Sequence, residues 1–479
     1  MTKTSGLEVF VNSVPGEIRL AVTNCGRLAD LVIVRYDELP VLGNIYLGRV
    51  KKVLAGLNAA FIDIGQNDSG FLAANDGQIL DRHNEKPKLI KALFKEGDAV
   101  IVQAIREPSE GKGVKLTTRL DLTGRTVVAT QGRPGVAISK NITDEEERAR
   151  LQTALVSYAH STTGLIVRTK ALGIATEIIQ RESKTLIEKI SSITAAQKTT
   201  PPPTCLYEEA DSILKYLRDL GGLDWQRIVV DDRATLIRLS NYLVDYAPEL
   251  ETLFELANNP VTLFETYDLD QQIDDLFDAR VVLPSGGGLI IEETAALVAI
   301  DVDSCAHNRD SDPELFAVAV NEEAAIEVAR QLVLRNLAGQ IIIDFLPMKR
   351  KKNRDKIQSL LSSALVKTGK CNIFGFSRLG LLEMTRQRNG ESLASRFLLK
   401  KEATRTVKTI TIDLIRAVLR EIACNPGRIL TVACSHKLYS YLKGDMQVIW
   451  NGLLARTGPI VVLEEISTFP ENKVEIRTR

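Results

Sequence analysis

The sequence predicts an α+β protein of several domains, and three observations lead to this prediction. A chain of 479 residues is longer than a single hydrophobic core usually organises. Residues 37–120 contain short apolar runs separated by Gly, Asn and Asp, which is the pattern of a small barrel. Residues 286–344 instead predict a strand, a helix and a second strand, as in an α/β layer.

Composition narrows the class of protein. A hydrophobic content of 44% with 25% charged residues is typical of a folded chain, and no apolar run approaches the roughly 18 residues that a membrane span requires. The N-terminus has no basic segment followed by an apolar one, so we expect a cytoplasmic protein. The 61 basic and 61 acidic residues give no overall attraction to nucleic acid, so such binding would need local patches.

The cysteines and histidines do not indicate a metal centre. The six cysteines never occur in CxxC spacing, and the four histidines are dispersed along the chain. Structural zinc sites and disulfide frameworks both need clustered ligands of these two types. We therefore expect neither of them.

Alternation of apolar and polar residues predicts the first elements. Residues 7–36 alternate in this way around Pro15 and Gly16, which predicts a strand hairpin. Beyond the barrel region, the sequence predicts strands at 124–132 and 163–170 and a helix at 175–193. The stretch "QKTTPPPT", residues 197–204, is the clearest linker-like segment.

The second half of the chain is predicted to contain both helices and strands. Between the two α/β strands we predict a helix that begins with Asn321 as its N-cap and stops at Gly339. The last region, from about 405, is predicted to hold a helix at 407–423 and strands at 428–434 and 459–465. This pattern is typical of a small α+β domain.

Carboxylates follow both apolar strands of the α/β region. Side chains on a strand alternate between its faces, so Asp301 and Asp303 share one face. The run of isoleucines at 341–343 ends in Asp344, and if the two strands are neighbours the three carboxylates meet at one edge of the sheet. Clustered carboxylates favour a cation between them, and hard oxygen ligands suit Mg²⁺ or Mn²⁺.

Other interpretations of this pattern stay open at this point. Carboxylates at strand ends also cap turns or pair with Lys and Arg, and a lone DxD is a weak motif. A nucleotide-sugar transferase also uses a DxD to hold a divalent ion on a diphosphate. The spacing of the aspartates does not separate these hypotheses.

Five stretches of the chain together resemble the ribonuclease E/G family of bacterial endoribonucleases. They are "GNIYLGRVKKVLAGLNAAFIDIG" with the following "GFL", "GLIVRT", "ALVAIDVDS", "NEEAAIEVARQLVLRNLAGQIIIDF" and "FGFSRLGLLEMTRQR". They occur in the family's order and at similar spacing, nearly from end to end. The length resembles the short, ribonuclease G type of chain.

The resemblance implies a definite division into domains. Residues 1–36 and 215–278 would form an RNase H-like subdomain, and residues 37–119 an inserted OB-fold RNA-binding barrel. A 5′-end sensor at 120–214, a DNase I-like catalytic domain at 279–400 and a linker with a small α+β domain at 401–479 would follow.

The resemblance also assigns site residues. Asp301 and Asp344 match the family's two magnesium-binding aspartates and are therefore the expected catalytic residues. Asp303 stands where the family usually has asparagine, so it is a candidate additional ligand that adds negative charge beside the metal. This extra charge would either tighten ion binding or repel the scissile phosphate.

Two further groups of residues are implied to contact RNA. Phe61 and Phe71 match aromatic residues that stack on bases, and Lys112 matches a phosphate contact, although barrel core is the plain alternative for each Phe. The pocket for a 5′-terminal monophosphate is matched by Gly124, Val128, Arg168 and Thr169. Guanidinium, hydroxyl and amide groups are suitable donors for phosphate oxygens.

One feature of the family is missing. After "LLEMTRQR" the family usually continues to a CPxC pair that shares zinc with a second subunit, whereas this chain has no Cys or His between residues 388 and 405. We expect no zinc, and a homodimer would have to form without a zinc link.

The sequence therefore predicts a magnesium-dependent endoribonuclease of single-stranded RNA. We expect 5′-phosphate and 3′-hydroxyl products, a preference for 5′-monophosphorylated substrates, and a role in ribosomal RNA processing or messenger RNA decay. The competing hypothesis is an RNA-binding maturation factor of the same family that has lost cleavage because of Asp303.

Overall fold

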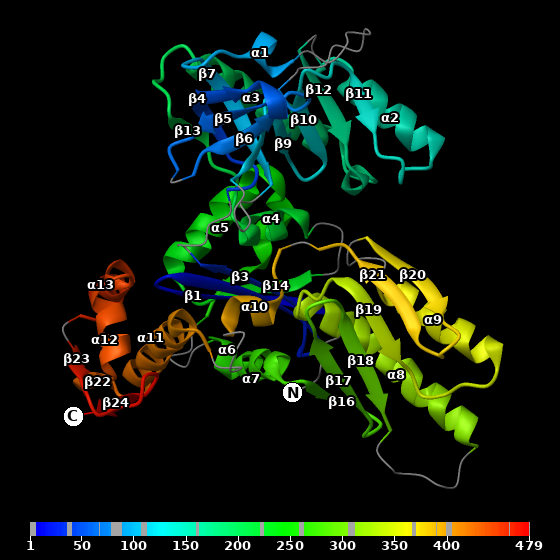
Figure 1. Cartoon of the computed structure of the whole chain (residues 1–479), viewed down its shortest axis with the longest axis vertical. Coiled ribbons are helices and arrows are strands. Elements are labelled where there is room, and N and C mark those ends of the chain that lie inside the picture. Colours follow the sequence, from blue (N-terminus) through cyan, green and yellow to red (C-terminus); the bar gives the residue numbers. More distant parts are fainter. Residues whose placement is uncertain are drawn as a thin grey trace. The chain divides into compact units, whose positions relative to one another are not determined.

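The chain is described from a computed structural model that covers residues 6–35, 41–66, 68–77, 89–106, 113–159, 162–220, 225–257, 263–304, 312–365, 370–388, 390–398, 405–458 and 460–478. It divides into two compact units. Figure 1 shows the chain coloured by residue number. The first unit comprises Met1–Val32, Trp225–Asp232 and Glu255–Arg479, and the second Ile33–Asp224 and Arg233–Phe254. In sequence, most of the second unit is therefore inserted into the first.

The N-terminal hairpin is present as predicted. Strand β1 (Leu7–Val14) pairs antiparallel with β2 (Glu17–Asn24), and Gly16 in the turn has a φ of 94°, which glycine adopts without strain. Strand β1 also pairs in parallel with β14 (Trp225–Val230). The sheet has the order β15-β14-β1-β2-β3, with β3 at Arg27–Arg35 and β15 at Phe254–Leu256. Three short elements follow, α6 (Leu263–Thr266), α7 (Leu269–Asp274) and the 3-10 helix η5 (Asp275–Phe277).

A six-stranded sheet contains the predicted α/β layer. Its order is β16-β17-β18-β19-β21-β20, and β18 and β19 are parallel neighbours. The strands are β16 (Arg280–Val282), β17 (Gly288–Glu293), β18 (Val298–Asp303), β19 (Gly339–Asp344), β20 (Cys371–Phe376) and β21 (Leu382–Arg386). Helix α8 (Pro313–Leu334) connects β18 to β19, and α9 (Lys351–Leu365) connects β19 to β20.

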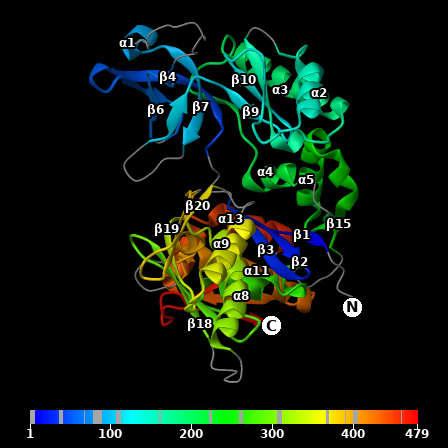
Figure 2. The same ribbon diagram turned by 90° about the vertical axis from the view of Figure 1, so that its right-hand side faces the viewer.

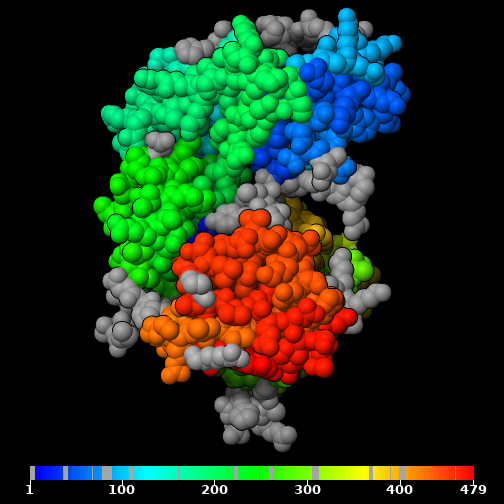
Figure 3. All heavy atoms as spheres, turned by 90° about the vertical axis from the view of Figure 1, so that its left-hand side faces the viewer, coloured from blue at the N-terminus to red at the C-terminus, as the bar shows by residue number. Residues whose placement is uncertain are grey.

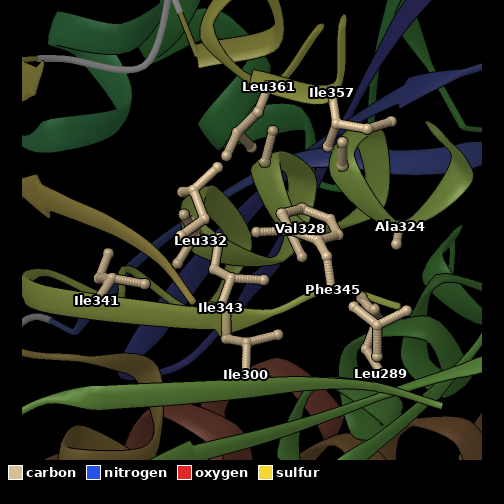
Figure 4. Packing of buried hydrophobic residues seen from close by; sticks show 14 of the residues in the cluster. Leu289, Ile300, Ala324, Val328, Leu332, Ile341, Ile343, Phe345, Ile357 and Leu361 are labelled. Atoms are coloured by element: carbon tan, nitrogen blue, oxygen red, sulfur yellow. The ribbon is translucent and has the colours of Figure 1, made fainter. Parts of the chain in front are cut away.

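Helices α8 and α9 cover one face of this sheet (Figures 1 and 2). Figure 4 shows the core between them, where Ile300 and Ile343 from the strands meet Val328 and Leu332 of α8 and Leu361 of α9. Each fully buried aliphatic side chain contributes about 1.5–3 kcal/mol relative to exposure. The packing therefore fixes which face of each strand points inward.

In the C-terminal region, helices pack against a three-stranded sheet. Helix α11 (Val407–Cys424) matches the predicted helix at 407–423, and the sheet order is β23-β22-β24. The short helix α10 (Leu393–Phe397) precedes this region, whose other elements are α12 (His436–Lys443), α13 (Gln447–Thr457), β22 (Leu430–Cys434), β23 (Val461–Glu465) and β24 (Val474–Thr478). In Figure 3 these residues appear as one continuous orange and red body.

The predicted barrel is present in the second unit. Strands β4, β5, β6, β8 and β7 pair in that order, and the pairing of β4 with β7 closes the sheet. Their bounds are β4 (Ile45–Leu54), β5 (Ala59–Asp63), β6 (Gly70–Ala73), β7 (Ala99–Arg106) and β8 (Lys115–Thr117), with the short helices η2 (Ala55–Leu57) and α1 (Ile90–Leu93). Alternate residues, including Ile62 and Leu72, fill the interior.

The rest of the second unit is a four-stranded sheet with helices against it (Figure 2). The sheet order is β11-β12-β10-β9, with β9 at Asp121–Thr123, β10 at Val127–Gln131, β11 at Val136–Ile138 and β12 at Thr163–Val167. The helical elements and the last strand are α2 (Glu145–Leu155), η3 (Thr169–Ala171), α3 (Thr176–Ala196), β13 (Thr204–Tyr207), α4 (Ser212–Asp219), α5 (Arg233–Tyr246) and η4 (Pro248–Leu253). Within the ranges that the structure describes, no helix has the length and apolar character needed to cross a bilayer.

The segment at 197–204 does not join two domains. It follows α3 and leads into β13, which pairs with β4 of the barrel, so all three elements belong to the second unit. Its prolines therefore mark a turn of the chain within one unit and not an interdomain linker.

The predicted bounds of α8 are wrong at both ends. The helix begins at Pro313, with the Asp312 side chain accepting from the Glu314 amide as the N-cap, eight residues before Asn321. At the other end, Asn336 has the left-handed φ of 48°, while Gly339 already belongs to β19. Asn321 is an interior residue of the helix and is fully buried.

Asn321 holds the segment that follows β19. Its side-chain amide donates to the carbonyl of Leu346 at 2.9 Å, and its side-chain oxygen accepts from the Leu346 amide at 3.0 Å. Leu346 is partly buried and lies outside any strand, so its backbone amide and carbonyl depend on such partners. This pair of hydrogen bonds anchors the chain two residues beyond Asp344.

We predict that Asn321→Ala loosens this segment locally. Each of the two lost hydrogen bonds contributes about 0.5–1.5 kcal/mol, so the Leu346 amide should exchange its hydrogen roughly five- to a hundredfold faster. Hydrogen–deuterium exchange measures this. Asn425→Ala, which removes a side-chain contact to Glu421 within α11, serves as the control, and unchanged protection of Leu346 in Asn321→Ala would contradict the prediction.

Candidate active site

Asp301 and Asp344 lie side by side on neighbouring strands. They are direct register partners in the parallel pair β18–β19, and the preceding partners, Ile300 and Ile343, point into the core beneath α8. Because successive side chains alternate, both carboxylates project from the opposite face, where they are exposed. Adjacent strands are about 4.8 Å apart, so the two carboxylates can approach one cation.

This pair fits a magnesium ion better than a metal that needs a protein cage. Mg²⁺ usually takes one or two carboxylates and completes its octahedron with water and substrate phosphate oxygens. Among the described residues, no group of three or more His, Cys, Asp or Glu side chains could hold a metal by itself. Asp301 and Asp344 would therefore supply the protein's oxygen ligands, and open positions would be left for water and phosphate.

Asp303 occupies the same exposed face one step further along β18. Its carboxylate Oδ2 lies 3.8 Å from Nη2 of Arg280, the first residue of β16. Gly288 lies between them in the sheet, as the register partner of both Asp303 and Val282. A Cβ atom at 288 would lie 3.5 Å from Arg280 Nε, so the guanidinium crosses the sheet over this glycine.

The Arg280–Asp303 contact bears on the charge beside the candidate metal site. Both side chains are about half exposed, and such ion pairs contribute little to stability. The pair nevertheless changes the local charge, because the positive guanidinium of Arg280 offsets the negative charge that Asp303 adds near Asp301. Arg280 was missed in the sequence analysis, since only the sheet register brings it to Asp303.

Phe61 and Phe71 form a pair on the outside of the barrel. They are register partners on β5 and β6, with ring centroids 5.9 Å apart and planes at 70°. Their neighbours Ile62 and Leu72 are fully buried in the barrel core, whereas both rings are partly exposed. The interpretation of these residues as barrel core is therefore not supported.

Two lysines extend this aromatic pair into a row across four strands. Lys52 on β4 is the register partner of Phe61, and Lys115 on β8 is that of Phe71. Lys115 Nζ also lies 2.8 Å from Asp76. Lys112, the phosphate contact that the family resemblance implies, falls outside the described residues, and the two lysines of the row emerge only from the strand pairing.

The four residues proposed for the monophosphate pocket come together around β9, β10 and β12. Val128 on β10 pairs with Thr123 of β9 and Ile166 of β12, Gly124 follows β9, and Arg168 and Thr169 follow β12. The Gly124 amide donates to the Val127 carbonyl at 2.8 Å, so it is already engaged in the turn. The Thr169 hydroxyl shares a hydrogen bond of 2.9 Å with Ser139.

A buried carboxylate shapes the turn at 124–126. Glu182 of α3 accepts hydrogen bonds from the backbone amides of Arg125 and Thr126 and from the Thr126 hydroxyl. A side chain at 124 would overlap Glu182 Oε1, which explains the glycine. Burial raises the pKa of Glu182 above its usual value despite these donors.

Arg168 is held by an acid that the sequence analysis did not single out. Its Nη1 and Nη2 donate to the two carboxylate oxygens of Asp219, at 3.0 and 3.1 Å. Burial alone would raise the pKa of Asp219, but the hydrogen bond and charge of Arg168, with the nearby Arg218, hold that pKa below its usual value. Asp219 is therefore an anion at neutral pH.

Comparisons of the chain with known proteins give consistent results. The sequence model described as "Ribonuclease E/G family" matches residues 121–389. A protein named "Ribonuclease G" from Haemophilus influenzae is 31% identical over 98% of this chain and 96% of its own. "Ribonuclease G" of Escherichia coli (strain K12) is 33% identical over 91% of this chain and 92% of its own, and "Ribonuclease E" of a Nostoc species is 35% identical over 74% and 52%.

Proposed function

The chain belongs to the ribonuclease E/G family, and from that membership we propose that it is an endoribonuclease that cleaves single-stranded RNA with the help of a divalent cation, Mg²⁺ or Mn²⁺. The observation that carries this proposal is the register pairing of Asp301 with Asp344 on the exposed face of their sheet. Two carboxylates on adjacent strands, with no third His, Cys, Asp or Glu grouped with them among the described residues, leave room for a phosphodiester at the same ion.

Asp301 and Asp344 would hold the ion and keep it on the open face of the sheet. When bound, a magnesium ion would lower the pKa of a water molecule and offset the negative charge of the phosphate. In such a hydrolysis a water oxygen bonds to phosphorus, the P–O3′ bond breaks and O3′ takes up a proton, which would give 5′-phosphate and 3′-hydroxyl ends.

The row Lys52, Phe61, Phe71 and Lys115 is the proposed path for single-stranded RNA on the barrel. A flat ring stacks on any base, at about 1–3 kcal/mol per base, and lysines offset backbone charge without reading sequence. Such a surface suits an enzyme of loose sequence preference. A local row of this kind also explains how a chain without net charge could bind an anionic polymer.

We further propose that 5′-monophosphorylated RNA is the preferred substrate. Arg168 and Thr169 offer a guanidinium and a hydroxyl at one end of a sheet, next to the turn at Gly124. A terminal phosphate carries more negative charge than a phosphodiester, so charge-assisted hydrogen bonds to it are strong. Ribosomal RNA processing and messenger RNA decay are the processes in which such cleavage would act.

A non-cleaving RNA-binding factor of the same family is the second candidate function. The observation that favours it is Asp303, because a third carboxylate would repel the scissile phosphate. Arg280 beside Asp303 weakens that repulsion, and the pair Asp301–Asp344 is intact. These two contacts favour cleavage over the second candidate.

The first prediction of this proposal concerns the two paired aspartates. Asp301→Asn or Asp344→Asn should lower cleavage of a 5′-labelled, AU-rich oligonucleotide by about 100-fold or more in magnesium, because one lost carboxylate weakens ion binding and water activation together. Binding of the same oligonucleotide, measured by fluorescence anisotropy, should stay within about twofold because the barrel is untouched.

The matched control is Glu292→Gln, which removes an exposed carboxylate from β17 on the same sheet and leaves both aspartates in place. It should cut at the wild-type rate. Asp303→Asn should also retain cleavage, since asparagine is the residue that the family resemblance implies there. Full activity of Asp301→Asn or Asp344→Asn would refute the assignment.

The second prediction concerns the barrel. Phe71→Ala should weaken oligonucleotide binding by roughly five- to a hundredfold, the equivalent of about 1–3 kcal/mol for one stacked base. Leu57→Ala, which truncates a side chain that is 65% exposed in the nearby helix η2, is the control for loss of apolar surface. Equal affinities for both variants and the wild type would remove the aromatic pair from the RNA path.

The third prediction concerns the 5′ end. A 5′-monophosphate should speed cleavage relative to a 5′-hydroxyl on the same oligonucleotide, and Arg168→Ala should abolish the difference, because a contact to phosphate acts only when the phosphate is present. Rates of the wild type and the variant on both substrates test this. Equal wild-type rates would show that the pocket does not select the 5′ end.

The last prediction concerns assembly. A shared tetrahedral zinc needs thiolates or imidazoles, and residues 388–405 supply none. Cys434 is buried, Cys371 is partly buried and Cys424 is exposed, and no two of them stand in CxxC spacing. We expect purified protein to contain no stoichiometric zinc by elemental analysis and its mass in solution to be unaffected by a zinc chelator. One zinc per two chains would overturn this expectation.

A further inference from the structure

The guanidinium of Arg168 is held from one side only. Nη1 lies 2.5 Å from the Gly124 carbonyl, 3.3 Å from that of Arg125 and 3.0 Å from Asp219 Oδ1, and Nη2 lies 3.1 Å from Asp219 Oδ2. Nη1 has two hydrogens for three acceptors, so its donors are fully used. Within the described part of the chain, Nε and the second hydrogen of Nη2 have no acceptor.

These two remaining donors lie along one edge of the planar group. Nε–H and the Nη2–H beside it point the same way, as a parallel pair spaced for two oxygens of one phosphate. Asp219 takes the other edge, formed by Nη1 and Nη2, in the same bidentate manner. The carboxylate therefore determines which edge of Arg168 is left for a ligand.

Asp219 itself stands in an unfavourable place for an acid. It is the last residue of α4, where the carbonyl end of the helix repels negative charge. Arg168 compensates for this, and so does Arg218, whose Nε lies 3.3 Å from Asp219 Oδ1. Arg218 is buried and its Nη1 donates to the Thr123 carbonyl at 2.6 Å, so it is fixed to the end of β9.

We propose that Asp219 is a positioning residue that sets the selectivity of this enzyme for the 5′ end of RNA, by holding the guanidinium of Arg168 so that its Nε–Nη2 edge receives a terminal phosphate. Arg218 anchors Asp219, and Asp219 orients Arg168. The inference rests on the 5′-phosphate preference proposed above and names the residues that give the pocket its geometry.

If Asp219 had a different role, its removal would change the preference for a 5′-phosphate in the opposite direction. If the carboxylate were an internal competitor that a phosphate had to displace, its removal would strengthen the preference. The carbonyls of Gly124 and Arg125 argue against competition, because they hold Nη1 on the Asp219 side whether or not the carboxylate is present. A phosphate on that side would meet two carbonyl oxygens as well as the guanidinium.

The test compares oligonucleotides that differ only at the 5′ end, as monophosphate or hydroxyl. Cleavage rates are measured with magnesium, and affinities by anisotropy on the same oligonucleotides with divalent cations removed by EDTA, so that the RNA stays intact. The proteins are the full-length wild type, Asp219→Ala, Asp219→Asn, Arg168→Ala and the double variant Asp219→Ala with Arg168→Ala. Glu188→Ala, an exposed acid of α3 in the same unit, is the surface control.

In Asp219→Ala, the advantage of the 5′-monophosphate should fall to within about twofold of its value in Arg168→Ala, in both rate and affinity. Cleavage of the 5′-hydroxyl substrate should be unchanged, which a merely unstable variant would not show. Asp219→Asn keeps one acceptor oxygen and should lie between the wild type and Asp219→Ala. The double variant should be no worse than Arg168→Ala, because both residues act through one contact.

Other outcomes overturn the inference in ways that can be told apart. A larger advantage in Asp219→Ala means that the carboxylate competes with phosphate, and an unchanged advantage means that it plays no part. If the wild type binds both 5′ ends with equal affinity, both the positioning role of Asp219 and the preference for 5′-monophosphorylated RNA are refuted. The proposed endonuclease activity is not affected by that result. Absence of cleavage by the wild type refutes the endonuclease proposal. The positioning role then stands if the wild type binds the 5′-monophosphate form more tightly and Asp219→Ala loses that difference.

Discussion

The parallel pairing of β18 with β19 is the constraint on which the candidate catalytic site depends. Parallel neighbours need a crossover, and α8 makes that connection and covers one face with apolar side chains. Ile300 and Ile343 are drawn beneath it, so their successors Asp301 and Asp344 must face the other way. A slip of one residue in the register would turn Asp344 toward the core. Asn321 bonds both backbone groups of Leu346 and secures the chain just past that carboxylate.

The barrel uses the same alternation for a different purpose. Ile62 and Leu72 fill its interior, and this leaves Phe61 and Phe71 on the outside, in register with Lys52 and Lys115. Neither the aromatic residues nor the lysines would be informative alone, since exposed lysines and half-buried rings are common on protein surfaces. Their alignment across four strands forms the surface that we propose for contact with bases and phosphates.

Two acidic side chains, Glu182 and Asp219, shape the turn that follows β9 in the second unit. Glu182 binds the amides beneath the turn, and Asp219 holds the guanidinium of Arg168 beside it. Both acids lie next to groups that would otherwise be free to reorient, and both are themselves satisfied by donors. The proposed pocket therefore has a defined direction, which suits recognition of one end group.

Local patterns in the sequence determined much of this protein. They placed the N-terminal hairpin, the barrel strands, helix α11 and the carboxylates at the ends of two apolar strands, because turn residues, periodicity and side-chain chemistry act over a few neighbouring positions. They misplaced the start of α8, where Asn321 has the chemistry of an N-cap but is buried against Leu346, and Asp312 with Pro313 begins the helix. Only the tertiary structure brought Arg280 to Asp303, aligned Lys52 and Lys115 with the aromatic pair, and joined Asp219 to Arg168. Those contacts depend on strand register and on the packing of segments distant in sequence, which are set by how apolar faces fit together and leave no periodic signal in the chain.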